Sequence, residues 1–103
     1  MESKENKESG LTDNKSLKQF EFITGGFTSR VEYMIMGNKI FLTHTEVPVE
    51  LEGKGIGSKI VKLALEEVES RGLKLIPLCP YVASYIKRHP EWKRVLAEYV
   101  NIN

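Results

Sequence analysis

The sequence contains a single cysteine, Cys79, so no disulfide can form within its 103 residues. Small secreted domains usually carry several disulfides, and the lone thiol therefore favours the reducing cytoplasm. Residues 1–10 lack the apolar stretch of a signal peptide, so nothing indicates export. The apolar run 73–78 is broken by Lys74 and Pro77 and falls far short of the ~20 residues of a membrane span, which predicts a soluble protein with no membrane partner.

The sequence also has no excess of either charge. Its 15 Lys and Arg residues stand against 14 Asp and Glu residues, which gives a net charge of +1. Such a protein has no strong overall field to attract a nucleic acid, so no nucleic-acid partner is expected. A chain this short builds one domain with a small core, and any ligand must bind near its surface.

The chain divides into a polar tail and one domain. Residues 1–16 are mixed in charge and almost devoid of large apolar side chains, so they cannot offset the entropy that is lost on ordering. We therefore expect a disordered tail over residues 1–16 and a single domain over residues 17–103.

Three β-prone stretches open the domain, over residues 17–24, 28–36 and 39–47. They are separated by Gly25-Gly26 and by Gly37-Asn38, which tolerate the positive φ angles of tight hairpin turns. This pattern predicts an antiparallel meander of three strands.

A helix is predicted over residues 56–71. One stripe at helical spacing carries its apolar residues, namely Ile56, Ile60, Leu63, Ala64 and Val68. Gly72 is expected to end this helix, and the short apolar run 73–78 suits a buried strand. A helix between two strands of one sheet indicates a parallel crossover.

A second helix is predicted from Pro80 to Arg88. It ends before Pro90, because the residue that precedes a proline is pushed out of helical geometry. Residues 92–100 are ambiguous and can form a last short helix. The predicted fold is therefore α/β with a mixed sheet: a three-stranded antiparallel meander, a helix, a parallel strand and a second helix.

The most informative stretch is the glycine loop, residues 53–58, with the sequence Gly-Lys-Gly-Ile-Gly-Ser at the start of the first helix. Several N–H groups at a helix start lack intrahelical partners, and glycines let a phosphate come close. A P-loop needs a lysine and then a hydroxyl after its last glycine, whereas Gly57 is followed by Ser58 and then Lys59. A dinucleotide loop needs Gly-x-Gly-x-x-Gly, whereas this loop reads Gly-x-Gly-x-Gly. The alternative to a phosphate site is that the glycines form only a flexible connection between a strand and the helix.

The glycine loop resembles the pyrophosphate loop of GNAT-type N-acetyltransferases, whose motif Gln/Arg-x-x-Gly-x-Gly/Ala is matched by Gly55 and Gly57. Two further runs agree with it: 44–48, His-Thr-Glu-Val-Pro, and 76–92, which begins Ile-Pro-Leu-Cys-Pro-Tyr and ends His-Pro-Glu-Trp. Together the three motifs resemble the small YjdJ-type branch of that superfamily, over about residues 20–92. The resemblance implies a minimal GNAT-like fold, acetyl-CoA as cosubstrate, and acetyl transfer to an amine.

The resemblance also implies which residues bind the cosubstrate: Val47, Gly53, Lys54, Gly55, Ile56, Gly57 and Ser58. One position departs from the family pattern, because Glu52 stands where the superfamily has a basic or amide residue. A carboxylate repels a pyrophosphate, unless Glu52 points to solvent and the loop amides, with Lys54 or Lys59, hold the anion. We expect acetyl-CoA to bind.

Members of the superfamily use an acid on the central strand as the base that takes the proton of the amine, and either Glu46 or His44 matches that position. Strand alternation predicts that both side chains share a face with Ile40 and Leu42. A hydrogen-bonded structural histidine is the alternative role for His44.

Cys79 is expected at the N-cap of the second helix, where the positive helix end favours a thiolate. It can accept the acetyl group itself, line the cleft during a direct transfer, or simply fill space in the core. Tyr85 resembles the superfamily tyrosine that protonates the leaving thiolate, and Tyr81 lies one helical turn before it. Packing is the alternative role for both.

The sequence leaves the acceptor open, as a small-molecule amine or a protein. A zinc site from Cys79, His44 and His89 is not expected, because no two of these ligands are closely spaced, so no metal is predicted. A monomer or a weak homodimer is expected. The alternative function is a non-catalytic CoA-binding or protein-interaction module on the same fold.

Overall fold

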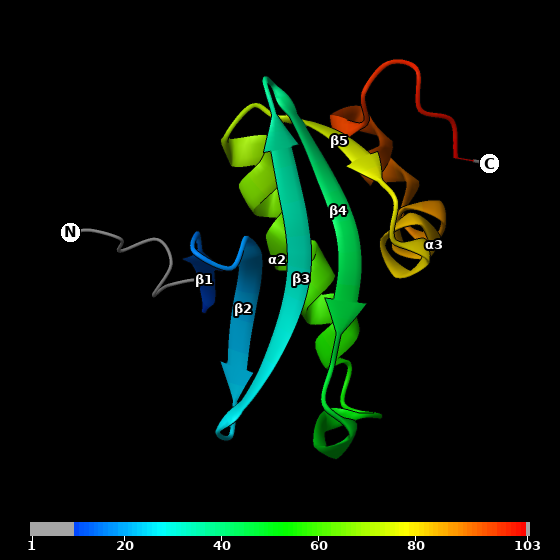
Figure 1. Cartoon of the computed structure of the whole chain (residues 1–103). Coiled ribbons are helices and arrows are strands. Elements are labelled where there is room, and N and C mark those ends of the chain that lie inside the picture. Colours follow the sequence, from blue (N-terminus) through cyan, green and yellow to red (C-terminus); the bar gives the residue numbers. More distant parts are fainter. Residues whose placement is uncertain (1–9, 103) are drawn as a thin grey trace.

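The computed structural model describes residues 10–102. Its centre is a five-stranded sheet with the strand order β1-β2-β3-β4-β5 (Figure 1). The first four strands pair with one another in antiparallel fashion: β1 (Leu11–Asn14), β2 (Gln19–Thr24), β3 (Phe27–Met36) and β4 (Lys39–Glu46). The fifth, β5 (Lys74–Pro77), pairs with β4 in parallel. The predicted α/β class with a mixed sheet is confirmed.

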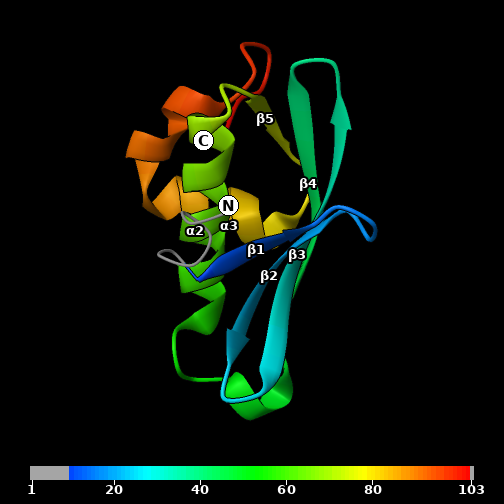
Figure 2. The same cartoon turned by 90° about the vertical axis from the view of Figure 1, so that its left-hand side faces the viewer.

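The helices α2 (Ile56–Ser70) and α3 (Pro80–Arg88) and the 3-10 helix η2 (Pro90–Val95) lie on one face of the sheet, and the other face is left open in the described part of the chain (Figure 2). The short 3-10 helix η1 (Val49–Leu51) follows the C-terminal end of β4, beyond the end of the sheet. We call the two faces the helix side and the open face. As the sequence predicts, Pro80 starts α3, and the helix ends at Arg88, with His89 as its C-cap before Pro90.

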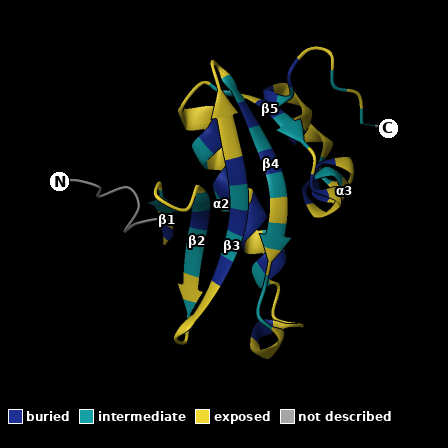
Figure 3. Ribbon diagram, in the orientation of Figure 1, coloured by how far each residue is buried: buried dark blue, intermediate teal, exposed yellow. Residues whose placement is uncertain are grey.

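The core lies between the sheet and α2. Alternate residues of β3 and β4 face it and are buried, and the residues between them are more exposed (Figure 3). The apolar stripe of α2 packs on them through Ile60, Ala64 and Val68, none of which is exposed. This burial of apolar surface is the main stabilisation of so small a domain.

The disordered tail predicted for residues 1–16 is wrong over Leu11–Asn14, which forms β1; residues 1–9 lie outside the described residues. Leu11 lies opposite Phe22 in β2 and is only 2% exposed. The Asp13 carboxylate accepts hydrogen bonds from the Tyr33 hydroxyl at 2.6 Å and from Arg71 at 2.7 Å. One apolar anchor and these charged contacts order a segment that its polar composition did not mark as structured.

The sequence leaves residues 92–100 ambiguous, and in the structure only their first part is helical. The 3-10 helix η2 ends at Val95, and Leu96 then forms a parallel bridge with Leu75. The Ala97 N–H donates to the Leu75 carbonyl at 2.9 Å. The free edge of β5 offers this pairing, which competes with helix formation. In residues 10–102, neither helix has the length and hydropathy that crossing a bilayer requires.

The stability of the fold should decrease at alkaline pH because of Tyr33. Burial, followed by the hydrogen bond to Asp13, raises the pKa of this tyrosine from 10.0 to about 12. Between these values the unfolded chain loses the phenol proton and the folded chain keeps it, so stability falls as pH rises. Between about pH 9.5 and pH 12, the free energy of unfolding of the wild type should therefore fall by about 2 kcal/mol more than that of Tyr33→Phe, as urea unfolding at each pH measures. Tyr99→Phe, at an exposed tyrosine, is the control; equal pH dependence in Tyr33→Phe and the wild type would contradict the assignment.

Candidate functional site

The glycine loop connects η1 to α2 on the helix side of the sheet. Gly53 and Gly55 have φ angles of 81° and 76°, in the left-handed region that glycine adopts without strain. Gly55 is the N-cap of α2 and supplies no capping side chain. The loop therefore presents bare backbone at the start of the helix.

The first turn of α2 has unpaired hydrogen-bond donors. The Lys59 N–H donates to the Gly55 carbonyl at 3.1 Å, and this is the first hydrogen bond of the helix. Within residues 10–102, the N–H groups of Ile56, Gly57 and Ser58 have no acceptor, and no acidic residue occupies the first turn. These N–H groups and the positive end of the helix dipole suit an anion.

A pocket of about 260 Å³ lies against this loop and is lined by Val47, Leu51, Glu52, Gly53, Gly55, Ile56, Gly57 and Tyr81. Five of the seven predicted cosubstrate-binding residues line it, while Lys54 and Ser58 belong to the loop without lining the pocket. A Cβ added at Gly57 would lie 2.1 Å from the Tyr81 hydroxyl oxygen. Glycine at this position thus lets the Tyr81 ring of α3 lie against the first turn of α2. Glu52 is exposed at the pocket.

A β-bulge in β4 determines which side chains reach each face. Tyr33 pairs with Leu42, but the preceding residue of β3, Glu32, pairs with His44, so Thr43 is an extra residue. The Thr43 hydroxyl donates to the Glu32 carbonyl at 3.2 Å. One extra residue reverses the alternation that follows it.

The prediction that His44 and Glu46 share a face with Ile40 and Leu42 is therefore wrong. Ile40 and Leu42 are buried on the helix side, whereas His44 and Glu46 are about half exposed on the open face. Thr45 takes the helix-side position instead. Strand alternation failed here because the bulge lies between Leu42 and His44.

His44 and Glu46 form a close pair on the open face. His44 Nε2 lies 2.8 Å from Glu46 Oε1. This hydrogen bond, and then the charge of Arg30, hold the pKa of the Glu46 carboxyl below its ordinary value. An ionised Glu46 only accepts hydrogen bonds, so Nε2 of a neutral His44 carries the hydrogen and Nδ1 is left to accept a proton. The arrangement suits a base that a carboxylate orients.

Strands β4 and β5 separate near their C-terminal ends. Their pairing ends at Leu42 and Pro77, because proline has no N–H with which to continue the ladder. The Cys79 N–H donates to the Leu42 carbonyl at 2.9 Å, and beyond this bond no pairing of β5 with β4 is found in the described residues. We call the space between the separating strands the fork.

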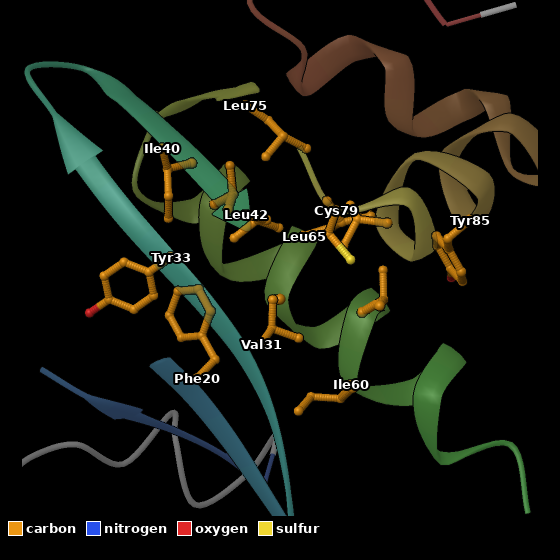
Figure 4. Close-up of a cluster of buried hydrophobic side chains, with 14 of the residues drawn as sticks. Phe20, Val31, Tyr33, Ile40, Leu42, Ile60, Leu65, Leu75, Cys79 and Tyr85 are labelled. Carbon is orange, nitrogen blue, oxygen red and sulfur yellow. The ribbon is translucent and has the colours of Figure 1, made fainter. Parts of the chain in front are cut away.

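Cys79 lies at the fork as the N-cap of α3, as predicted, and it is 5% exposed. Its Sγ lies 3.4 Å from the Thr45 hydroxyl oxygen, on the helix side. Figure 4 shows its sulfur directed into the cluster of buried side chains. Cys79 and the His44–Glu46 pair therefore flank the same part of β4 from opposite faces.

The two tyrosines of α3 have different surroundings. Tyr81 is 42% exposed and lines the glycine-loop pocket, whereas Tyr85 is 5% exposed and belongs to the core cluster with Cys79 (Figure 4). The Tyr85 ring packs on His89, with 4.3 Å between the ring centroids. Burial, and then the charge of Glu91, raise the pKa of the Tyr85 phenol.

Two further features bear on ligands. No group of three or more His, Cys, Asp or Glu residues suitable for a metal ion occurs between residues 10 and 102. A larger hollow, of about 540 Å³, lies at the other end of β4 and β5 and is lined by Asn38, Lys39, Lys74, Leu96, Ala97, Glu98 and Tyr99. None of the predicted site residues lines it, so we place the candidate site at the glycine loop and the fork.

The sequence does not indicate where three residues of the site lie. It suggests Tyr81 only as a phenol beside the thioester, and it assigns no role to Leu51 or Thr45. Thr45 lies within the run 44–48, but only the bulge brings it to Cys79. The position of Leu51 depends on η1, a single short turn that the local pattern does not mark.

Comparison with known proteins agrees with this geometry. Residues 19–95 match the family described as GCN5-related N-acetyl-transferase. The chain is 34% identical over 80 residues to Protein NATD1 of Mus musculus and 32% identical over 80 residues to Protein NATD1 of Xenopus tropicalis, covering 75% of this chain and 73% of each relative. Protein NATD1 of Homo sapiens is 39% identical over 59 residues, 56% of this chain and 52% of that protein. The chain belongs to the GCN5-related N-acetyl-transferase family.

Proposed function

We propose that this protein is an acetyl-CoA-dependent N-acetyltransferase of the small YjdJ-type branch, and that it works in the cytoplasm, where Cys79 remains a free thiol. One observation carries the proposal: the N–H groups of Ile56, Gly57 and Ser58 are unpaired and lie at the pocket. The glycines that line the pocket have no side chains to block an anion. The pyrophosphate of CoA binds these groups, as anions do at helix N-termini.

The thioester arm of acetyl-CoA runs from this pocket to the fork. Val47 lines the pocket and lies two residues after Thr45, and Tyr81 lines it two residues after Cys79. The end of β4 and the start of α3 thus both connect the pocket to the contact between Thr45 and Cys79. The edge of β4 beyond Leu42, which β5 does not pair, offers backbone groups to the amides of the arm.

We propose that Cys79 is the first group to accept the acetyl from CoA, because its thiol lies on the same face of β4 as the pocket. Its thiol first loses its proton to solvent; the Sγ thiolate then attacks the thioester carbon, a new C–Sγ bond forms, and the bond from that carbon to the CoA sulfur breaks. CoA leaves as a thiolate and takes up a proton. Tyr85 is our candidate for this acid, because it belongs to the same buried cluster as Cys79 and its phenol carries a proton at neutral pH.

The amine then approaches from the open face. Its nitrogen attacks the acetyl carbon, the C–Sγ bond breaks, and Cys79 is restored. The Nδ1 atom of His44 takes the proton that the nitrogen loses, while Glu46 holds Nε2 at 2.8 Å. The acceptor is a small-molecule amine or a protein amine, because the open face is uncovered in the described part of the chain. The protein acts as a monomer or a weak homodimer.

Acetyl transfer to a panel of amines tests this function. The panel contains small primary amines, lysine peptides and peptides with a free N-terminus, and each reaction is followed by CoA thiol release and by the mass of the product. We expect an acetylated amine, with its formation reduced in His44→Ala. Neither CoA release nor product with any amine would contradict the proposal. Slow CoA release without an acetylated amine would favour the alternative, a non-catalytic CoA-binding or protein-interaction module.

Glu52 at the pocket favours that alternative, because its carboxylate repels the pyrophosphate. Glu52→Gln should therefore tighten acetyl-CoA binding, about two- to fivefold at low ionic strength, and less as salt screens the exposed charge. Calorimetric titration at two salt concentrations measures the effect. Glu50→Gln is the matched control, because Glu50 is exposed in η1 and does not line the pocket. Equal affinities of Glu52→Gln and the wild type would show that Glu52 does not face the anion.

A further inference from the structure

Thr45 is held on the helix side of β4 by the bulge at Thr43. It lies directly opposite Val31 of β3, which is fully buried, and Thr45 itself is half-buried. A β-branched side chain has restricted χ1 rotamers, so its hydroxyl has few orientations available. The strand thus fixes where the Thr45 hydroxyl points.

The contact of this hydroxyl is the Cys79 sulfur, 3.4 Å away, in a hydrogen bond that either atom can donate. The backbone of Cys79 is fixed independently, because its N–H bonds to the Leu42 carbonyl and its carbonyl accepts from the Ala83 N–H at 3.1 Å. The Thr45 hydroxyl and the Cys79 sulfur are therefore in contact because the backbone of each residue is fixed by hydrogen bonds of its own. Thr43, two residues earlier, uses its hydroxyl differently, on the Glu32 carbonyl.

We propose that Thr45 is a positioning residue for acetyl transfer, whose hydroxyl holds the Cys79 sulfur in place and donates a hydrogen bond to it when the sulfur is a thiolate. The proposal rests on the function proposed above, in which Cys79 carries the acetyl group. A thiolate has no hydrogen to donate, so the hydroxyl must be the donor in that state. Hydrogen bonds to charged groups are the stronger ones, which favours the reactive form of the sulfur.

Thr45 exchanges no proton in the reaction. The Sγ lone pair forms the bond to the acetyl carbon, the electrons of the broken bond leave with the CoA sulfur, and the Thr45 hydrogen stays on its oxygen. Thr45 therefore acts only through the orientation and charge of Sγ. Its loss should slow reactions of the thiol without weakening the binding of CoA at the glycine loop.

Alkylation of Cys79 by iodoacetamide tests this without any cosubstrate. The intact mass reports one adduct, because Cys79 is the only cysteine. We expect Thr45→Val to slow alkylation about tenfold at neutral pH, since the hydrogen bond that holds Sγ is lost. Thr45→Ser, which keeps the hydroxyl, should restore the rate. Thr28→Val is the matched control, with the same substitution at an exposed threonine of β3 away from the bulge, and should alkylate as the wild type does.

Calorimetry with acetyl-CoA separates the two proposals. Unchanged affinity in Thr45→Val, together with slower alkylation and slower acetylation of Cys79, supports the role of Thr45. If the wild type binds no acetyl-CoA or is never acetylated, the proposed function fails, while the alkylation series still decides what Thr45 does to the thiol. An alkylation rate of Thr45→Val equal to that of the wild type, or an equal decrease in Thr28→Val, would overturn the inference. Should Thr45→Val not fold, Thr45→Ala carries the same test.

Discussion

Gly57→Ala should weaken the binding of acetyl-CoA at least tenfold while the protein stays folded. The added Cβ would lie 2.1 Å from the Tyr81 hydroxyl oxygen and 2.8 Å from the ring carbon that carries it. Tyr81 is 42% exposed and can shift, so the fold survives. Alanine also favours the helix by about 1 kcal/mol over glycine, which offsets part of the contact strain. The methyl group and the displaced ring then occupy the space that the pyrophosphate needs.

Calorimetric titration measures this affinity, and urea unfolding checks the fold. Ser70→Ala, at the exposed C-terminal end of α2, is the control and should bind as tightly as the wild type. A second substitution, Tyr81→Ala in the Gly57→Ala protein, removes the ring and should recover part of the affinity. If Gly57→Ala is folded and binds acetyl-CoA as the wild type does, the anion does not lie at the glycine loop.

Cys79→Ser should abolish the acetyl-enzyme and reduce amine acetylation at least a hundredfold. In the wild type, incubation with acetyl-CoA and no amine should give an adduct of about 42 Da, one acetyl group. Serine is close in size to cysteine and is a preferred N-cap residue, so α3 should be retained. Its hydroxyl is a much weaker nucleophile than a thiol when no base activates it, so the covalent route should stop.

Intact mass spectrometry and the amine assay are run together on Cys79→Ser and on Cys79→Ala. An adduct that persists in either variant would lie on another residue. Full amine acetylation by Cys79→Ser would contradict the covalent route and leave direct attack of the amine, with the pair of His44 and Glu46 as its base. Unchanged acetyl-CoA affinity in both variants shows that only the chemical step was lost.

Most of the fold was predictable because its signals are local. The β2–β3 and β3–β4 turns are marked by glycine, α2 by its apolar stripe, and α3 by Pro80 and Pro90 at its ends. The strand β1 escaped prediction because its order depends on partners far along the chain. Asp13 is held by Tyr33 and Arg71, residues that no short window around β1 contains.

The site divides in the same way. The glycine loop was predictable, since anion binding by a helix start depends on a few consecutive residues. The faces of His44 and Glu46 were not, because the extra residue Thr43 is defined only by the register between β3 and β4. The same bulge brings Thr45 to Cys79, across 34 positions of the sequence. Strand alternation alone predicts neither the faces of His44 and Glu46 nor the contact between Thr45 and Cys79.

A titration of ¹⁵N-labelled protein with acetyl-CoA, followed by NMR, tests the central claim most directly. We expect saturable shifts of the amides in the glycine loop, residues 53–58, and along the unpaired edge of β4 after Leu42. Half-saturation should come well below about 1 mM. No shifts up to that concentration would contradict the account, and so would shifts confined to the hollow beside Lys39, Lys74 and Tyr99 at the opposite end of the sheet.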